Sequence, residues 1–303
     1  AAALLFPVFF GAALLLFPDV SAAAAREGVT LCLQTVLPSL FPFFVLSSLL
    51  VQSDVPRLLS RAMAGVMYPL FGVSGAGASA LILGLLGGYP VGARTVAELY
   101  GRGEIAREEA EQLLAFCNNS GPGFFLGVCG TAVFGSVRAG AYLYLIHVGA
   151  ALMTGVLLRR DLGLPRRRAV PRQRAPFDLA AALPAAVQGS FAAVGSVSAF
   201  VIFFMVLLRL MSLVPTLASL PPLPRAALFG LVEMTNGVNA LPGTRAGFVL
   251  CAAIMNWGGL SVQAQTRAML AGSGLSARRC VIGKAVQALV GVPLALLAAG
   301  RLF

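Results

Sequence analysis

The chain has 303 residues, of which 58% are hydrophobic and only 11% are charged. A composition this apolar excludes an ordinary soluble domain and predicts an all-α polytopic membrane protein. The net charge of +11 does not indicate a nucleic-acid-binding protein, because the arginines lie between apolar segments and form no stripe interleaved with aromatic residues. The expected partners are the lipid bilayer and a small molecule.

The first predicted element is an apolar run over residues 2–17, which we assign to a first transmembrane helix within residues 1–20. Residues 20–25 resemble a signal-peptidase site, but no basic region precedes the run in the sequence given, so a retained helix is favoured. Residues 22–34 have the amphipathic pattern of an interfacial helix, and residues 37–51 are predicted to span the membrane.

A second amphipathic helix is predicted over residues 57–70, ending near Pro69. Residues 73–100 follow as two short arms around a glycine- and proline-rich tip, residues 87–92. Such a pattern predicts a re-entrant hairpin that enters the bilayer and returns. Arg94, just after this tip, either faces an anionic substrate or snorkels to the cytoplasmic surface.

Residues 105–135 form one predicted crossing that the polar stretch 118–123 interrupts. Asparagine, glycine and proline there release backbone groups that hydrocarbon cannot satisfy, so protein or a water-filled cavity must take them up. A further span is predicted over residues 139–158. The loop at residues 159–177 is expected to be cytoplasmic by the positive-inside rule, because it carries Arg159, Arg160, Arg166, Arg167, Arg168, Arg172 and Arg174.

The second half of the chain shows the same order of elements. Its predicted elements are an interfacial helix (178–191), a span (194–214), a hairpin with a polar tip (233–239), a span (245–270) broken at 256–259, and a last span (281–299). Each half makes three crossings, which is an odd number, so residues 21–158 and 178–303 are predicted to be two inverted repeats. Inverted repeats are typical of transporters.

The two hairpin tips and the two broken spans are predicted to meet near the bilayer midplane. Half-helices that begin after Ser120 and Gly258 would direct their positive dipole ends at an anion, and two such ends suit a substrate with two anionic groups. The alternative is that these residues only pack helices together. The candidate substrate-binding residues are Gly88, Tyr89, Pro90, Arg94, Asn118, Asn119, Ser120, Gly121, Glu233, Thr235, Asn236, Asn239, Asn256, Gly258, Ser261 and Gln263.

Glu233 is the one acidic residue expected at depth in the membrane. It either binds a coupling proton or cation such as Na⁺, or forms a structural pair with Arg94, Arg267 or Lys284. Lys284 itself is given little functional weight, because it lies near the end of its predicted span. No cofactor, resident metal or catalytic residue is expected.

An enzyme is an alternative, because residues 72–75 match the GxSG pattern of rhomboid-type intramembrane proteases and the chain has one histidine, His147. A serine nucleophile needs a base within hydrogen-bond reach. Ser74, however, lies in a run of small residues, and proteolysis does not account for the repeat. HExxH and Walker A patterns are absent, so the chain is predicted not to be an enzyme.

Three motifs carry a resemblance to a known family: residues 88–94, 109–122 and 258–265. In these the chain resembles the YlbJ (SpoVV) family of sporulation integral membrane proteins, from about Arg26 to the C-terminus. That family is similar to the nucleoside-recognition gate proteins and distantly to concentrative nucleoside transporters. The resemblance implies hairpins and broken helices around a central site.

The same resemblance implies a multi-pass protein of a bacterial membrane, the outer forespore membrane, that moves dipicolinic acid by alternating access. The alternatives are transport of a nucleoside or other small polar metabolite, and a non-transporting membrane component of a sporulation complex. A homo-oligomer is left open. Many relatives have histidine where this chain has Gln263, and glutamine cannot titrate near neutral pH, so a histidine proton relay at that position is excluded here.

Overall fold

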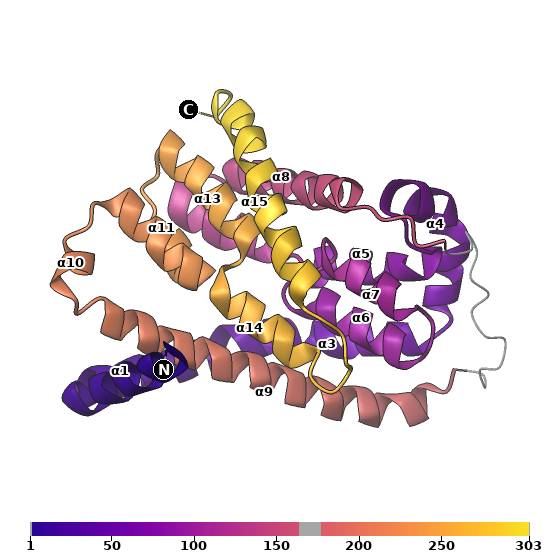
Figure 1. The fold of residues 1–303 in the computed structure, drawn as a ribbon, viewed down its shortest axis with the longest axis horizontal. Coiled ribbons are helices and arrows are strands. Elements are labelled where there is room, and N and C mark those ends of the chain that lie inside the picture. The colour runs from indigo at the N-terminus through magenta and orange to yellow at the C-terminus, as the bar shows by residue number, and fades with distance from the viewer. Residues whose placement is uncertain (1, 164–176, 303) are drawn as a thin grey trace.

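A computed structural model of the chain describes residues 2–163 and 177–302 (Figure 1). This part of the chain is helical and contains no β-strand. Four helices are long and apolar enough to cross a bilayer, and two bent helix pairs raise the number to six. The all-helical prediction is therefore confirmed, with several helices of membrane length. Most of the predicted basic loop, residues 164–176, lies outside the described residues.

The N-terminal helices α1 (Ala2–Leu16) and α2 (Pro18–Leu31) meet at a bend of 101°. Helix α2 then continues through a π-helical turn, η1 (Cys32–Val36), into α3 (Leu37–Gln52). The predicted break between these two helices is thus absent, whereas the interfacial position of residues 22–34 stays a prediction. Pro38 lacks the N–H of an α-helical ladder, and the π-helical turn in front of it carries the helix past that gap.

Helix α9 (Leu179–Met211) also replaces two predicted elements with one, because its 33 residues run without a break. The sequence at the expected junction, residues 191–194, contains neither glycine nor proline, so nothing ends the helix there. Helix α9 runs antiparallel to α2 and α3: Gly28 faces Ile202, and the Cys32 thiol lies 3.6 Å from the Ser198 carbonyl. The two long helical units thus form one side of the molecule.

The first predicted hairpin is present as two short helices. Helix α4 (Val55–Phe71) ends at Gly72, whose φ of +68° suits glycine, and the short η2 (Gly75–Gly77) leads into α5 (Ala78–Gly87). Helix α6 (Val91–Gly101) packs back against α5. The two arms and their tip match the prediction, whereas their entry into the bilayer stays a prediction.

Both predicted interruptions of the spans are confirmed. Helix α7 (Arg107–Leu114) stops before an irregular stretch, and the chain resumes as the π-helix η3 (Phe124–Val133). The second interruption separates α13 (Arg245–Trp257) from α14 (Gly259–Met269), with φ of +81° at both Gly258 and Gly259. The remaining helices are α8 (Val137–Leu157), α10 (Pro215–Ala218), α11 (Pro222–Val232), α12 (Met234–Asn239) and α15 (Arg278–Ala299).

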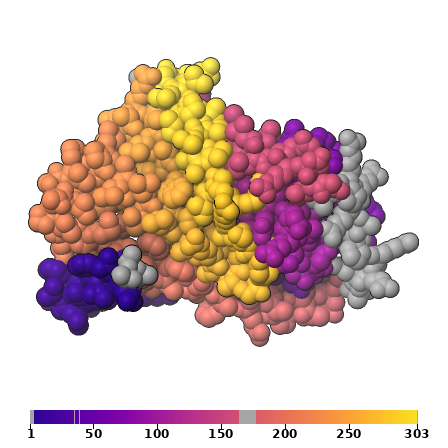
Figure 2. All heavy atoms as spheres, in the orientation of Figure 1, coloured from indigo at the N-terminus to yellow at the C-terminus, as the bar shows by residue number. Residues whose placement is uncertain are grey.

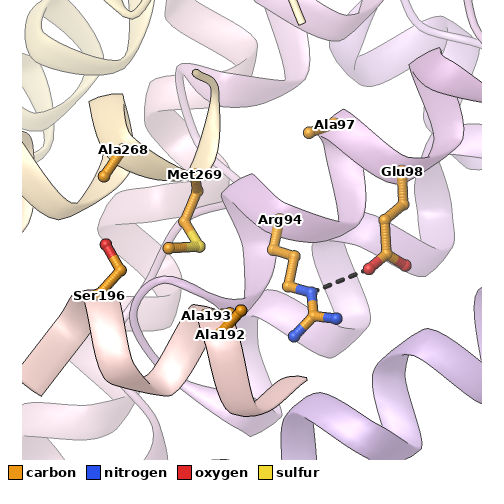
Figure 3. Close-up of a pocket in the computed structure, with 8 residues that line it drawn as sticks. All are labelled: Arg94, Ala97, Glu98, Ala192, Ala193, Ser196, Ala268 and Met269. Atoms are coloured by element: carbon orange, nitrogen blue, oxygen red, sulfur yellow. Dashed lines mark hydrogen bonds and ion pairs between the residues drawn. The ribbon is translucent and has the colours of Figure 1, made fainter. Parts of the chain in front are cut away.

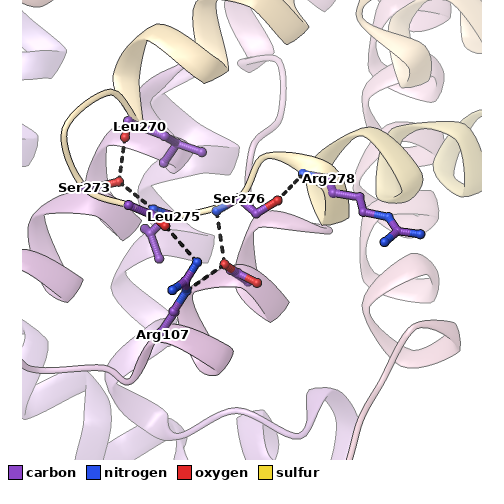
Figure 4. A network of polar contacts seen from close by, with 8 residues as sticks. Arg107, Leu270, Ser273, Leu275, Ser276 and Arg278 are labelled. Atoms are coloured by element: carbon purple, nitrogen blue, oxygen red, sulfur yellow. Dashed lines mark hydrogen bonds and ion pairs between the residues drawn. The ribbon is translucent and has the colours of Figure 1, made fainter.

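Helix α15 crosses one face of the molecule, where it lies between other helices of the second half and helices of the first half (Figure 2). It packs against α13 and α8, and its first turns contact α7. The loop before it is tied to α7 as well: Arg107 donates to the Gly274 carbonyl at 3.0 Å, and the Ser276 N–H donates to Glu111 at 3.1 Å (Figure 4). These contacts fix α14 and α15 against the helix that leads into the first interruption. A pseudo-two-fold relation between the halves stays a prediction.

Candidate functional site

The first interruption is built from three buried polar residues, Asn118, Asn119 and Ser120. The Asn118 amide donates to the Thr266 hydroxyl of α14 at 2.9 Å, and its oxygen accepts the Ala93 N–H of α6 at 3.4 Å. Asn118 therefore joins the first interruption both to the hairpin and to the half-helix that follows the second interruption.

Asn119 points to the other side, toward α15. Its side-chain oxygen accepts from Lys284 Nζ at 3.2 Å and from Gln287 Nε2 at 3.1 Å, while its amide nitrogen donates to the Phe116 carbonyl at 2.8 Å. Lys284 also donates to Gln287 Oε1 at 2.7 Å. All three side chains are fully buried.

His147 on α8 connects the two interruptions. The Ser120 N–H donates to His147 Nε2 at 3.1 Å, so the imidazole proton resides on Nδ1, which donates to Asn256 Oδ1 at 2.9 Å. Asn256 is held in turn by its donation to the Ala252 carbonyl at 2.8 Å. One neutral imidazole thus links the backbone of the first broken span to a side chain of the second.

The tip of the first hairpin completes this arrangement through Tyr89. Its hydroxyl lies 3.4 Å from the Met255 carbonyl, and its ring lies under the Lys284 ammonium, with 5.0 Å from Nζ to the ring centroid. We call this set of side chains the central polar network, and it consists of Tyr89, Asn118, Asn119, His147, Asn256, Thr266, Lys284 and Gln287, together with the Ser120 N–H. It brings together one hairpin tip and both broken spans.

Lys284 gives the central polar network its charge. The contacts of its ammonium are the Asn119 and Gln287 oxygens and the Tyr89 ring, which are all neutral, and no carboxylate in the described part of the chain forms an ion pair with it. A buried cation without a counter-charge is costly. The network is therefore electropositive and suited to an anion.

Sequence reasoning missed four members of the network: His147, Thr266, Lys284 and Gln287. The sequence gives Lys284 little weight because it lies near a helix end, yet α15 begins at Arg278 and the Lys284 side chain is fully buried. A signal was present, because Lys284 and Gln287 lie three residues apart on one face of an otherwise apolar helix.

Arg94 lies apart from the central polar network. It is buried, pairs with Glu98 at 2.9 Å, contacts the Ser190 hydroxyl at 3.3 Å and lies over the Phe44 ring. It lines a cavity of about 400 Å³ between α6, α9 and α14 (Figure 3). Its predicted contact with substrate is untested.

The hairpin tips meet the interruptions through their backbones. Gly88 of the first tip lies against Gly121, where a Cβ on Gly88 would be 3.1 Å from the Gly121 nitrogen. In the second half, Gly259 lies against the backbone of Glu233, where a Cβ would be 3.1 Å from the Glu233 Cα. Pro90 is buried between Tyr89 and α6. Close backbone approach therefore holds each tip to one interruption.

The polar side chains of the second tip do not join the network in the described structure. The Glu233 carboxylate caps α12, accepting from the Thr235 N–H at 3.0 Å and the Asn236 N–H at 2.8 Å. Among the described residues Glu233 forms no ion pair with Arg94, Arg267 or Lys284, while its predicted role in binding a coupling ion stays a prediction. Asn239 is exposed. In α14, Gln263 donates to the Trp257 carbonyl at 3.4 Å, and Ser261 accepts from Gln265, so both are buried but locally satisfied.

Replacing Glu233 with alanine is expected to lower the stability of the folded protein by about 1 kcal/mol, because the first N–H groups of α12 lose their acceptor. Thermal unfolding in detergent measures this loss, and Glu233→Asp serves as the control that keeps a carboxylate cap. Solute transport per folded molecule should be unchanged. Lost transport at wild-type stability would instead support a coupling ion at Glu233.

Ser74 has no catalytic geometry. Its N–H donates to the Glu109 carboxylate at 2.7 Å and its hydroxyl to the same oxygen, whereas His147 is engaged by Ser120 and Asn256. Among the described residues, the serine and the histidine do not form the pair that a serine protease requires.

Comparison with known proteins places this geometry in a family. The family model described as Gate, nucleoside recognition, matches residues 33–288. The chain is 28% identical over 319 aligned positions to the sporulation integral membrane protein YlbJ of Bacillus subtilis (strain 168), covering 93% of this chain and 78% of that protein. No solved structure matches the chain. The match spans every member of the central polar network.

Proposed function

The chain belongs to the Gate family of nucleoside-recognition proteins, and from this premise we propose that it is a membrane transporter of a small organic anion, with dipicolinic acid as the favoured substrate. Transport would proceed by alternating access, with the hairpins moving against the long helices. The relation to a sporulation membrane protein supports a place in the bacterial cell membrane, and the outer forespore membrane is the proposed location.

The observation that carries this proposal is the fully buried amine of Lys284, which forms no ion pair with a carboxylate in the described part of the chain. Its ammonium lies between the first interruption and the first hairpin tip, the two kinds of element at which transporters bind substrate and ions. A carboxylate brought to this position would supply the missing counter-charge and form a charge-assisted hydrogen bond. Neither a neutral solute nor a purely structural role would supply a counter-charge for the Lys284 ammonium.

The surroundings of Lys284 favour a flat aromatic acid over an aliphatic one. The Tyr89 ring lies next to the ammonium, and the Phe125 ring packs on His147 with 4.9 Å between centroids. Asn119, Asn256 and Gln287 supply amide groups for a second polar group on the ligand. Dipicolinate combines a planar ring with two carboxylates.

A nucleoside is the second candidate substrate. The same amides suit the exocyclic groups of a base, the aromatic rings suit its faces, and the description of the family names nucleoside recognition. A nucleoside, however, would leave the charge of Lys284 uncompensated.

The test is uptake by the purified full-length chain in liposomes, with labelled dipicolinate and labelled uridine compared in parallel. We expect saturable dipicolinate uptake that excess uridine does not inhibit. Asn118→Ala and Asn256→Ala should abolish uptake at normal expression, because Asn118 joins the first interruption to α14 and Asn256 joins the second interruption to His147. Uridine uptake alone would replace the proposed substrate, and wild-type uptake by both variants would contradict the proposed site.

A further inference from the structure

The single histidine of the chain lies where the two broken spans meet. His147 is fully buried: Nε2 accepts the Ser120 N–H, and Nδ1–H donates to Asn256 at 2.9 Å and lies 3.4 Å from Gln287 Nε2. We propose that His147 binds a coupling proton, so that this proton and an organic anion at Lys284 cross the membrane together. This inference rests on the proposed transport function and names its coupling ion.

Protonation of His147 would change its hydrogen bonds and therefore the structure around it. Imidazolium carries an N–H on both nitrogens. The Nδ1–H still donates to Asn256, but Nε2–H then faces the Ser120 N–H, and two donors cannot share a hydrogen bond. Protonation must therefore separate His147 from Ser120. Since Ser120 lies directly after Asn119, the Lys284 partner, this separation changes the interruption that holds the anion site.

The charges around His147 order the two binding events. On α15, Lys284 is connected to His147 by Gln287. The Gln287 side chain accepts from the Lys284 ammonium, and its Nε2 lies 3.3 Å from the His147 carbonyl oxygen. The groups in contact with His147 from α13 and η3 are neutral, namely Asn256 and Phe125. Two neutral tyrosines lie one contact further away, Tyr144 against Phe125 and Tyr89 against Lys284. The Lys284 ammonium opposes a second positive charge nearby. An anion bound at Lys284 neutralises the ammonium and so removes this repulsion. Binding of the anion therefore allows His147 to bind the proton.

In this cycle an O–H bond of hydronium breaks as the N–H bond on His147 forms, and the reverse exchange returns the proton to water. The proton leaves water on one side of the membrane, resides on His147 Nε2 while the anion is bound, and leaves to water on the other side with the anion. An empty site keeps the neutral imidazole that the Ser120 and Asn256 contacts imply. A proton therefore does not cross without the anion, which is the condition for coupled transport.

The decisive variant is His147→Gln. A glutamine at this position has an oxygen to accept the Ser120 N–H and an amide N–H to donate to Asn256, but it cannot be protonated near neutral pH. It therefore keeps both structural contacts and removes only the titration. The full-length protein is reconstituted in liposomes with the membrane potential clamped, and labelled dipicolinate is the probe.

With one proton per anion, wild-type protein should accumulate dipicolinate about tenfold for each pH unit of an imposed proton gradient. The glutamine variant should equilibrate dipicolinate without accumulating it. Equal accumulation by both proteins would overturn the inference. Downhill wild-type movement of dipicolinate that a proton gradient does not affect would overturn the coupling alone and leave the proposed function in place.

Because the chain has one histidine, nitrogen NMR of labelled histidine reports on His147 alone, provided that the purification tag contains none. In detergent at about pH 6.5, the ordinary midpoint of histidine, we expect the neutral Nδ1–H tautomer without ligand and imidazolium with saturating dipicolinate. A neutral imidazole in dipicolinate-bound protein would overturn the inference. Absence of both dipicolinate binding and transport would reject the proposed substrate, and the coupling with it.

Discussion

Replacing Lys284 with methionine is expected to abolish dipicolinate binding while the protein stays folded. Removal of one partner of a buried, hydrogen-bonded charge pair costs about 2 kcal/mol or more, which is about 30-fold or more in affinity. Methionine fills a similar volume without the charge. Because the ammonium is buried among neutral groups in the ligand-free protein, its removal should leave thermal stability unchanged or higher.

Two further variants separate charge from packing in this experiment. Lys284→Arg keeps the charge and should retain part of the affinity, since the larger guanidinium must fit beside Tyr89 and Gln287. Arg278→Met removes the same charge from the exposed first turn of the same helix, where the side chain points away from the loop (Figure 4). It should bind dipicolinate within about twofold of wild type, because exposed charges are screened. Wild-type affinity in Lys284→Met would reject Lys284 as the anion site.

The interruptions could be predicted from the sequence because they are local. Glycine, proline and polar amides in an apolar run cannot continue a membrane helix by themselves, so residues 118–123 and 256–259 were predicted as interruptions and found as such. The continuity of the two long helical units, α2 to α3 and α9, could not be predicted in this way. An amphipathic pattern reports which face is polar, but it does not report whether the backbone stops between two patterned segments.

The partners of the interrupted elements were not predictable from local pattern. Asn119 and Lys284 are 165 residues apart, and only the packing of α15 against α7 and α8 brings them together. The matched order of the two halves predicted that the two broken spans would meet, but not which side chain would join them. His147, outside both interruptions, connects Ser120 to Asn256. The second hairpin tip uses its carboxylate to cap its own helix.

The docking of the first hairpin onto the first interruption leads to the second large effect. Gly84 of α5 and Gly92 of α6 both face the Cys117 carbonyl, one residue before Asn118. A Cβ on Gly92 would lie 3.0 Å from the Asn118 Cα and closer still to the Cys117 carbonyl group. These are backbone atoms of the interruption itself, so the neighbours cannot move aside by changing a rotamer.

Gly92→Val is therefore expected to cost about 3 kcal/mol or more and to reduce the yield of folded protein sharply. The matched control is Gly101→Val in the same helix, where a Cβ meets nothing within 4 Å. Thermal unfolding and gel filtration in detergent compare the two variants. In any Gly92→Val protein that does fold, displacement of the hairpin should move Tyr89 from Lys284 and Ala93 from Asn118, so dipicolinate uptake should also be lost. Wild-type stability and uptake in Gly92→Val would show that the hairpin does not dock on the interruption. The hairpin tip would then not be part of the central polar network.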